Sequence, residues 1–333
     1  MRLLATALLA CLPLTAVAAS SYGPQLEGFD YPWPVQTFPL DSQRQTLQMA
    51  YLDVMPQGSA KGTVLLLHGK NFCAATWQET IKPLRAAGYR VIAPDQIGFC
   101  KSSKPQGYQY SFGQLAANTH ALLQHLGLED TPVHVVGHSM GGMLAARYAL
   151  LYPQDVRSLS LVNPIGLEDW KALGVPWRSV DAWYANELKT SFDSIKRYQL
   201  DVYYDGQWKP EYEHWARMQA GMYEGDGKQA VAWSQALTSD MVFNQPVIYE
   251  LKHITVPTTL FIGQKDRTAI GRDRAPAALK ATLGNYPALG RAAAQAIPGA
   301  QLVEFAELGH SPQVQDPARF NAALLRALTR PSP

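Results

Sequence analysis

The chain has 333 residues, of which 47% are hydrophobic, so it is long enough and apolar enough to bury a large core. Its 29 basic and 27 acidic residues give a formal charge of +2, a balance that leaves no electrostatic footprint for nucleic acid or an anionic membrane surface. The histidines have no metal-ligand spacing and no glycine loop suits a phosphate, so we expect no metal, cofactor or nucleic-acid partner.

The first segment has the composition of a secretory signal peptide. Arg2 precedes an uncharged run over residues 3–19, and small residues precede a cleavage site after Ala18 or Ala19. We expect residues 1–19 to be removed on export, which leaves a charge of +1 (28 basic against 27 acidic residues). The run is short for a stable membrane span. Residues 8–11 resemble a lipobox, but the apolar core continues past Cys11, which favours a periplasmic or secreted protein over a lipoprotein.

Alternating β and helical stretches follow, and they predict a doubly wound, mostly parallel sheet of eight strands. The first two strands read as an antiparallel hairpin. A fifth strand is expected just before Gly137. The other predicted strands cover residues 35–40, 46–54, 63–67, 90–94, 157–162, 258–262 and 302–305, and the helices cover 74–87, 112–126, 143–151 and 315–328.

The fifth strand ends in the motif G-x-S-x-G around Ser139, and a helical segment follows at once. A serine on such a sharp strand-to-helix turn is held in a strained backbone, with its hydroxyl projecting beyond the sheet. Side chains at Gly137 and Gly141 would collide with the neighbouring strand and helix. We therefore predict that Ser139 is a nucleophile.

An acid and a histidine follow two later strands. Asp266 comes after the strand at 258–262, and His310 after the strand at 302–305. Both lie beyond the carboxyl end of a strand, where open parallel sheets bind their ligands. Asp169, after the sixth strand, is an alternative acid that fits less well than Asp266.

Serine, acid and histidine in this order resemble the α/β-hydrolase fold family over nearly the whole mature chain. The resemblance implies that His310 takes the proton of Ser139 and that Asp266 orients the imidazole. It also implies a helical lid between the sixth and seventh strands, which here is the segment 165–250, inserted into a core of residues 20–164 and 251–333. That segment holds six of the eight tryptophans. We expect most of its aromatic residues to pack, and a few to line a pocket for a small acyl substrate with an apolar or aromatic part.

The family also supplies an expectation for the two amides that would bind an oxyanion. One is the amide of Met140, directly after the nucleophile. The other lies after His68 and Gly69, where we favour Lys70 and place Asn71 second. Lys70 departs from the apolar residue or glycine often found there. We expect its side chain to be solvated, the alternative being that it assists an anionic substrate. We expect His68 to be structural through a side-chain hydrogen bond, and His138 to pack under the turn.

Two cysteines remain after export, Cys73 and Cys100. They lie in the loops after the third and fourth strands, which are neighbours in the family sheet. Cys100 also replaces the second glycine of the family pattern D-x-R-G-x-G-x-S. These observations predict a disulfide, with two buried free thiols as the alternative.

The predicted reaction is the hydrolysis of a carboxylic ester through an acyl-enzyme, as in carboxylesterases. The same residues would also serve an amidase or aminopeptidase, a lactonase, a carbon–carbon hydrolase or a cofactor-free haloperoxidase-like protein. The chain lacks the H-G-G-P-G loop of proline iminopeptidases, which disfavours the aminopeptidase. A non-catalytic binding protein is the competing class, and the complete triad argues against it.

Overall fold

The computed structural model describes residues 21–330, so the predicted signal peptide lies outside the described residues. Eight strands form one sheet in the order β1-β2-β4-β3-β5-β6-β7-β8. This confirms the predicted fold class. The strands are β1 (Val35–Ser42), β2 (Gln45–Val54), β3 (Gly62–Leu67), β4 (Tyr89–Pro94), β5 (Val133–His138), β6 (Val156–Val162), β7 (Thr258–Gly263) and β8 (Gln301–Phe305).

The sheet is antiparallel at one edge and parallel elsewhere. β1 and β2 form the predicted hairpin, and β2 pairs antiparallel with β4. From β4 to β8 every pair is parallel, with Leu65 of β3 opposite Ile92 on one side and Val135 on the other. Because the central strands are buried on both faces, they read as continuous apolar runs rather than alternating ones. Because the strands from β5 to β8 run parallel, the carboxyl ends of β5, β7 and β8 lie at the same edge of the sheet.

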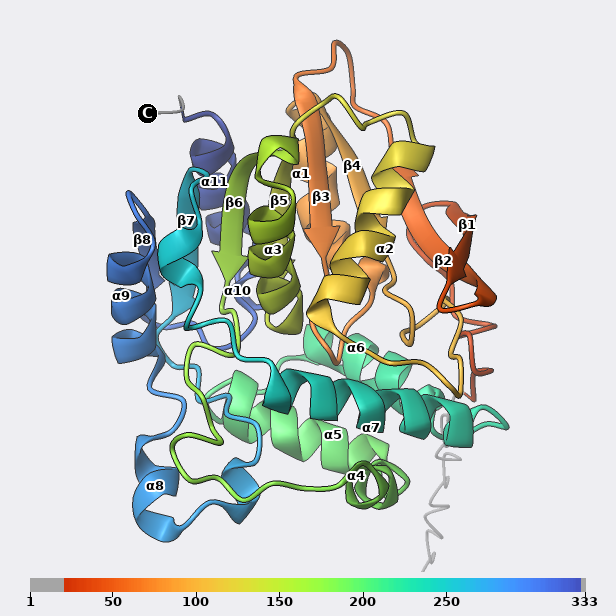
Figure 1. The fold of residues 1–333 in the computed structure, drawn as a ribbon, viewed down its shortest axis with the longest axis vertical. Coiled ribbons are helices and arrows are strands. Elements are labelled where there is room, and N and C mark those ends of the chain that lie inside the picture. The colour runs from red at the N-terminus through yellow and green to blue at the C-terminus, as the bar shows by residue number, and fades with distance from the viewer. Residues whose placement is uncertain (1–20, 331–333) are drawn as a thin grey trace, which may run out of the picture.

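Helices cover both faces of the sheet (Figure 1). On one side lie α2, α3 and α9; α1 and α11 lie on the other and contact each other. Their bounds are α1 (Gln78–Ala86), α2 (Phe112–His125), α3 (Met140–Leu151), α9 (Tyr286–Ala296) and α11 (Pro317–Leu328), and the short helices α8 (Ala277–Thr282) and α10 (Pro312–Gln315) lie nearby in the chain.

Two predicted helices begin later than the sequence indicated. The stretch predicted from residue 74 opens with a 3₁₀ turn, η1 (Ala74–Trp77), before α1 begins. The closing helix is interrupted at Asp316, whose backbone is not helical (φ −144°, ψ 76°). Its side chain caps α11 by accepting the Arg319 amide at 3.1 Å. Pro317 then occupies the first helical position, where its missing N–H costs nothing.

The segment predicted as a lid contains four helices and no strand. They are α4 (Val180–Glu187), α5 (Phe192–Tyr198), α6 (Pro210–Gly221) and α7 (Lys228–Asn244), and a π-helical turn, η3 (Gln199–Tyr203), continues α5. Figure 1 shows these helices lying across the carboxyl ends of the strands. We call residues 165–250 the cap.

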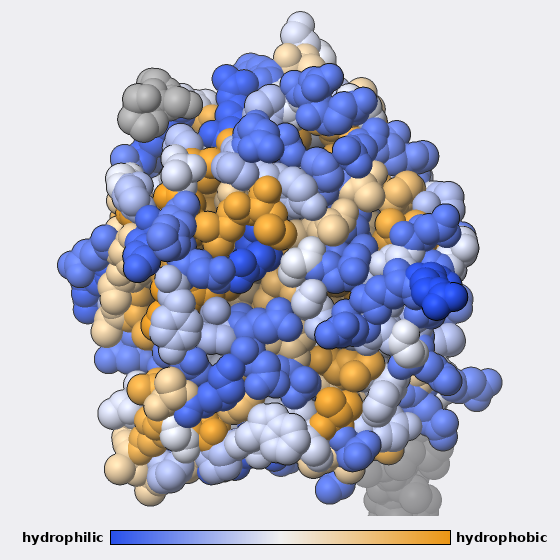
Figure 2. Space-filling model, in the orientation of Figure 1, coloured by the Kyte–Doolittle hydropathy of each residue, from blue (hydrophilic) through white to orange (hydrophobic). Residues whose placement is uncertain are grey.

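The surface view shows hydrophobic residues in several separate patches among hydrophilic ones (Figure 2). Cap residue Trp177, with 62% of its surface exposed, is the most exposed large aromatic side chain in the described part of the chain. No helix within residues 21–330 is both long enough and apolar enough to cross a membrane.

Candidate active site

Ser139 lies on a strained turn between β5 and α3. Its backbone has φ 57° and ψ −119°, a region that residues with a side chain rarely adopt. A Cβ at Gly137 would overlap the carbonyl oxygen of Gly141, and one at Gly141 would overlap that of Leu67. The close approach of β3, β5 and α3 thus explains both glycines of the motif.

Ser139, His310 and Asp266 are brought together by hydrogen bonds, although they are far apart in the chain. The Ser139 hydroxyl lies 2.8 Å from His310 Nε2, and His310 Nδ1 lies 2.6 Å from Asp266 Oδ2. Because a carboxylate only accepts, Nδ1 carries the proton, which leaves Nε2 free to accept from the serine. This is the arrangement in which an imidazole can act as general base.

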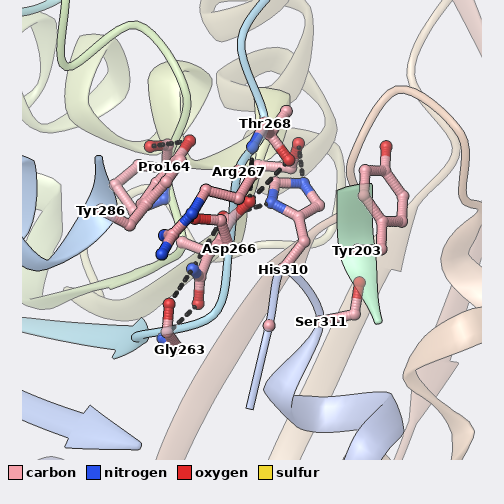
Figure 3. Close-up of polar contacts among 12 residues, drawn as sticks. Pro164, Tyr203, Gly263, Asp266, Arg267, Thr268, Tyr286, His310 and Ser311 are labelled. Atoms are coloured by element: carbon pink, nitrogen blue, oxygen red, sulfur yellow. Dashed lines mark hydrogen bonds and ion pairs between the residues drawn. The ribbon is translucent and has the colours of Figure 1, made fainter. Parts of the chain in front are cut away.

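The Asp266 carboxylate has two further partners that the sequence did not reveal. The side-chain amide of Asn163 donates to Oδ2 at 2.8 Å. Oδ1 accepts from the Thr268 amide at 2.8 Å and from the Thr268 hydroxyl at 2.7 Å. With the bond from His310, four donors occupy the acceptor sites of one carboxylate (Figure 3). The orientation of Asp266 is therefore fixed from all sides.

Asp169, the alternative acid, takes no part in this arrangement. Its carboxylate accepts from the Tyr249 hydroxyl at 2.9 Å and from the Lys171 amide at 3.0 Å, both in an exposed part of the chain. The carboxylate bonded to His310 belongs to Asp266.

His138 does more than pack under the turn, which corrects the sequence-based expectation. Its Nε2 donates to the backbone carbonyl of His310 at 2.8 Å. Burial, together with the adjacent His310, lowers the pKa of His138 well below 6.5, so the ring stays neutral. His138, the residue before the nucleophile, therefore holds the backbone carbonyl of His310 in place.

The loop after β3 lies against the nucleophile. A Cβ at Gly69 would stand only 3.0 Å from Ser139 Cβ, so a side chain there would press on the nucleophile. His68 makes the expected side-chain hydrogen bond, because its Nε2 accepts the Gln96 amide at 3.0 Å. Within residues 21–330 the amides of Met140, Lys70 and Asn71 have no hydrogen-bond acceptor. They therefore remain the predicted donors to an oxyanion.

The Lys70 side chain is not solvated, contrary to expectation. Only 13% of it is exposed, because α4 and α7 of the cap cover the loop. Its ammonium group lies 2.7 Å from the side-chain oxygen of Gln235 and 3.3 Å from the Glu187 carboxylate. Tyr223 donates to the same carboxylate at 2.8 Å. We call residues 68–73, which carry the predicted oxyanion donor, the oxyanion loop. This loop is thus held to the cap by a buried ion pair.

The same loop is joined to the loop after β4. Cys73 and Cys100 are paired as a disulfide, with their Cα atoms 6.0 Å apart. Cys100 has a left-handed backbone, with φ 44°, which explains why glycine suits this position in the family pattern.

The site is closed. Ser139 exposes 4% of its surface, and Asp266 and His310 expose none. The enclosed cavity beside the oxyanion loop measures about 10 Å³, which is room for about one water molecule. This cavity lies between the core and the cap. Its lining consists of the core residues Lys70, Asn71, Phe72, Cys73, Phe99 and Cys100 and the cap residues Gln219, Met222, Tyr223, Val231 and Gln235. A substrate therefore requires movement of the cap.

Relatives of this chain include hydrolases of several kinds. Lipase 1 of Psychrobacter immobilis is 29% identical over 288 residues, which cover 83% of this chain and 80% of the relative. The 2-hydroxy-6-oxononadienedioate/2-hydroxy-6-oxononatrienedioate hydrolase 1 of Dechloromonas aromatica is 28% identical over 287 residues, 85% of this chain and 91% of the relative.

Solved structures agree with these relatives. The crystal structure of a probable hydrolytic enzyme from Pseudomonas aeruginosa PAO1 is 62% identical, with a TM-score of 0.92 and coverage of 94% of this chain and 99% of that one. The enol-lactonase of Burkholderia xenovorans LB400 is 18% identical, with a TM-score of 0.66 and coverage of 88% and 100%, and this likeness shows the fold alone. The model of the alpha/beta hydrolase fold family matches residues 62–317. Because this match spans most of the chain, the protein belongs to the alpha/beta hydrolase family of enzymes.

Proposed function

We propose that the protein is an exported serine hydrolase that cleaves a carboxylic ester through an acyl-enzyme. The observation that carries the proposal is the hydrogen-bonded series from Ser139 through His310 to Asp266. Ser139 lies on a strained turn, and the amides of Met140 and Lys70 have no acceptor among the described residues.

In the first half-reaction His310 Nε2 removes the hydroxyl proton while Ser139 Oγ attacks the carbonyl carbon. The negative charge that develops on the carbonyl oxygen is received by the amides of Met140 and Lys70. The protonated His310 then gives its proton to the departing alcohol, and Asp266 stabilises the imidazolium meanwhile. In the second half-reaction water takes the place of the alcohol, releases the acid and restores Ser139.

An ester is favoured over other acyl substrates because Lipase 1, which aligns over most of this chain, is named as a lipase, and lipases hydrolyse esters. The carbon–carbon hydrolase of Dechloromonas aromatica and the enol-lactonase keep those two reactions as competing candidates for the same serine. Export is supported by the composition of residues 1–19 and by the cysteine pair in the oxyanion loop.

A fluorophosphonate probe and a substrate panel test the proposal together. We expect the probe to label Ser139 in a one-to-one ratio, because its hydroxyl is bonded to a general base. Among p-nitrophenyl esters, lactones, aminoacyl amides and a vinylogous diketone, we expect the esters to show the highest kcat/KM. Mass spectrometry locates the label. Failure to label Ser139 would reject the mechanism, and a preference for another compound in the panel would reject the ester.

The enclosed cavity beside the oxyanion loop is proposed as the closed form of the acyl pocket. It touches the predicted oxyanion loop at Lys70 and its cap side is formed partly by the apolar side chains of Met222 and Val231. Both are almost fully buried. A cap side chain that ends this pocket would set the length of the acyl group.

Truncating a side chain on the cap side of this pocket is therefore expected to change substrate preference. In Met222→Ala the ratio of kcat/KM for long over short acyl esters should rise about 10- to 100-fold, because the added space buries further methylene groups. Val231→Ala should act in the same direction, and Trp177→Ala, in an exposed part of the cap, should leave the ratio unchanged. Steady-state kinetics on an ester series measure it. Should all three variants keep the wild-type profile, the cavity is not the acyl pocket.

A further inference from the structure

A single turn of the cap contacts three of the loops that build the site. At its carboxyl end, η3 presents carbonyl groups that have no partner within the turn. The Tyr203 carbonyl accepts the His310 amide at 2.9 Å, and the Val202 carbonyl accepts the Arg267 amide at 3.4 Å. The Tyr203 hydroxyl accepts the side-chain amide of Asn71 at 2.9 Å. These partners belong to the loop after β8 that carries His310 (the histidine loop), the loop after β7 that carries Asp266 (the acid loop) and the oxyanion loop.

The Tyr203 ring also covers the imidazole. Figure 3 shows His310 between the Asp266 carboxylate and this ring. The Tyr203 and His310 ring centroids are 4.3 Å apart, with an angle of 33° between the planes. A Cβ at Gly309 would overlap the Tyr203 carbonyl oxygen, so the histidine loop can approach the cap this closely only with glycine there. The backbone of His310 is thus held at its N–H by Tyr203 and at its carbonyl by His138.

The hydroxyl of Tyr203 reaches the oxyanion loop through one side chain. Asn71 donates to that hydroxyl and accepts from the side-chain amide of Gln219, another cap residue, at 3.1 Å. Asn71 directly follows Lys70, whose amide is the predicted oxyanion donor. Burial raises the pKa of Tyr203 well above its ordinary value, so the group that accepts from Asn71 is a neutral hydroxyl. A turn with π-helical hydrogen bonding is uncommon and occurs often at functional sites.

We infer that Tyr203 is a positioning residue that links closure of the cap to the geometry of the oxyanion loop and of His310. The inference rests on the proposed function, because it assigns a role in that reaction. When the cap is seated, the Tyr203 hydroxyl holds Asn71 and so aims the Lys70 amide, while its ring and carbonyl hold the imidazole. When the cap lifts, both supports leave the site together.

Tyr203→Phe isolates the role of the hydroxyl, because it keeps the ring and the backbone. We expect kcat for an ester to fall about tenfold while KM changes less than twofold, because a misaimed oxyanion donor weakens transition-state binding only. Tyr204→Phe is the matched control. It removes an equally buried hydroxyl from the next residue, and that hydroxyl has no hydrogen-bond partner among the described residues. Equal kcat values for the two variants would overturn the inference.

A double-mutant cycle of Tyr203→Phe with Asn71→Leu tests whether the Tyr203 hydroxyl acts through Asn71. If the hydroxyl acts through Asn71, the double variant should be no slower than Asn71→Leu alone. If the losses in kcat of the two single variants multiply in the double variant, the Tyr203 hydroxyl does not act through Asn71, and that part of the inference is overturned.

Amide hydrogen exchange gives a readout that does not depend on turnover. In Tyr203→Phe, peptides covering residues 68–73 should exchange faster than in wild type, and in Tyr204→Phe they should not. Unchanged exchange in Tyr203→Phe would also overturn the inference. Failure of wild-type protein to react with fluorophosphonate would reject the proposed function instead, so the two failures are distinguishable.

Discussion

Replacing Ser139 or His310 by alanine is expected to lower kcat about 10⁶-fold, and the double variant should lose little more. The two side chains act in one proton transfer across a 2.8 Å contact, so removing either abolishes the same step. Asp266→Asn should cost less, about 10⁴-fold. Steady-state hydrolysis of an activated ester measures all four variants, and the thermal midpoint of each verifies folding.

The contacts of Asp266 explain why an amide would fail there. Thr268 directs two donors at one oxygen, so the asparagine oxygen would face Thr268 and its NH₂ group would face His310. His310 Nδ1 would then have to accept, which moves the proton to Nε2, the atom that must receive it from Ser139. Asp169→Asn is the control and should retain wild-type activity. An inactive Asp169→Asn beside an active Asp266→Asn would mean that the acid is misassigned.

Loss of the Cys73–Cys100 disulfide is expected to lower the free energy of unfolding by about 3–4 kcal/mol, because the bond closes a loop of 27 residues. Because the loop carries Lys70, reductant should also lower kcat before global unfolding begins, with KM less affected. Denaturant titration and kinetics at increasing dithiothreitol measure the two effects. Thiol titration of the unfolded, unreduced mature protein tests the bond itself, and two free thiols would refute it.

Two substitutions at one position separate the covalent bond from the backbone. Cys100→Ala and Cys100→Gly both remove the disulfide, but only glycine adopts a φ of 44° without strain. We expect Cys100→Gly to be more stable than Cys100→Ala by about 1 kcal/mol. Equal stabilities would mean that the left-handed conformation relaxes once the bond is gone.

The fold could be predicted because each core strand carries its own signal. Buried parallel strands are short apolar runs, and turn residues bound them, as at residues 258–262 before Gly263. The ends of helices were harder to place, since they depend on single residues. The interruption at Asp316 arises from a capping side chain followed by Pro317, a local detail that the apolar periodicity of the closing helix hides.

The site was predictable to the extent that it follows the strands. Ser139, Asp266 and His310 each come just after a strand, and parallel strands bring such positions to one edge. Asn163 shares that signal, as a polar residue directly after β6, and could have been found in the same way. Tyr203 could not, because its contact with His310 depends on how the cap folds back over the sheet. The burial of Lys70 was missed for the same reason, since Glu187 and Gln235 lie more than 100 residues away.

The contact between η3 and the histidine loop limits how caps can be exchanged among related hydrolases. The cap enters and leaves the core between β6 and β7, so a graft with new specificity could in principle replace it as one piece. A replacement that lacks the turn at residues 199–203 would leave the His310 amide without its acceptor. Such a chimera would bring in a different pocket and lose part of the catalytic support. Grafts that retain this turn, keep Gln219 and Gln235 as partners of the oxyanion loop, and exchange the rest of α6 and α7 are therefore the better route to altered substrate range.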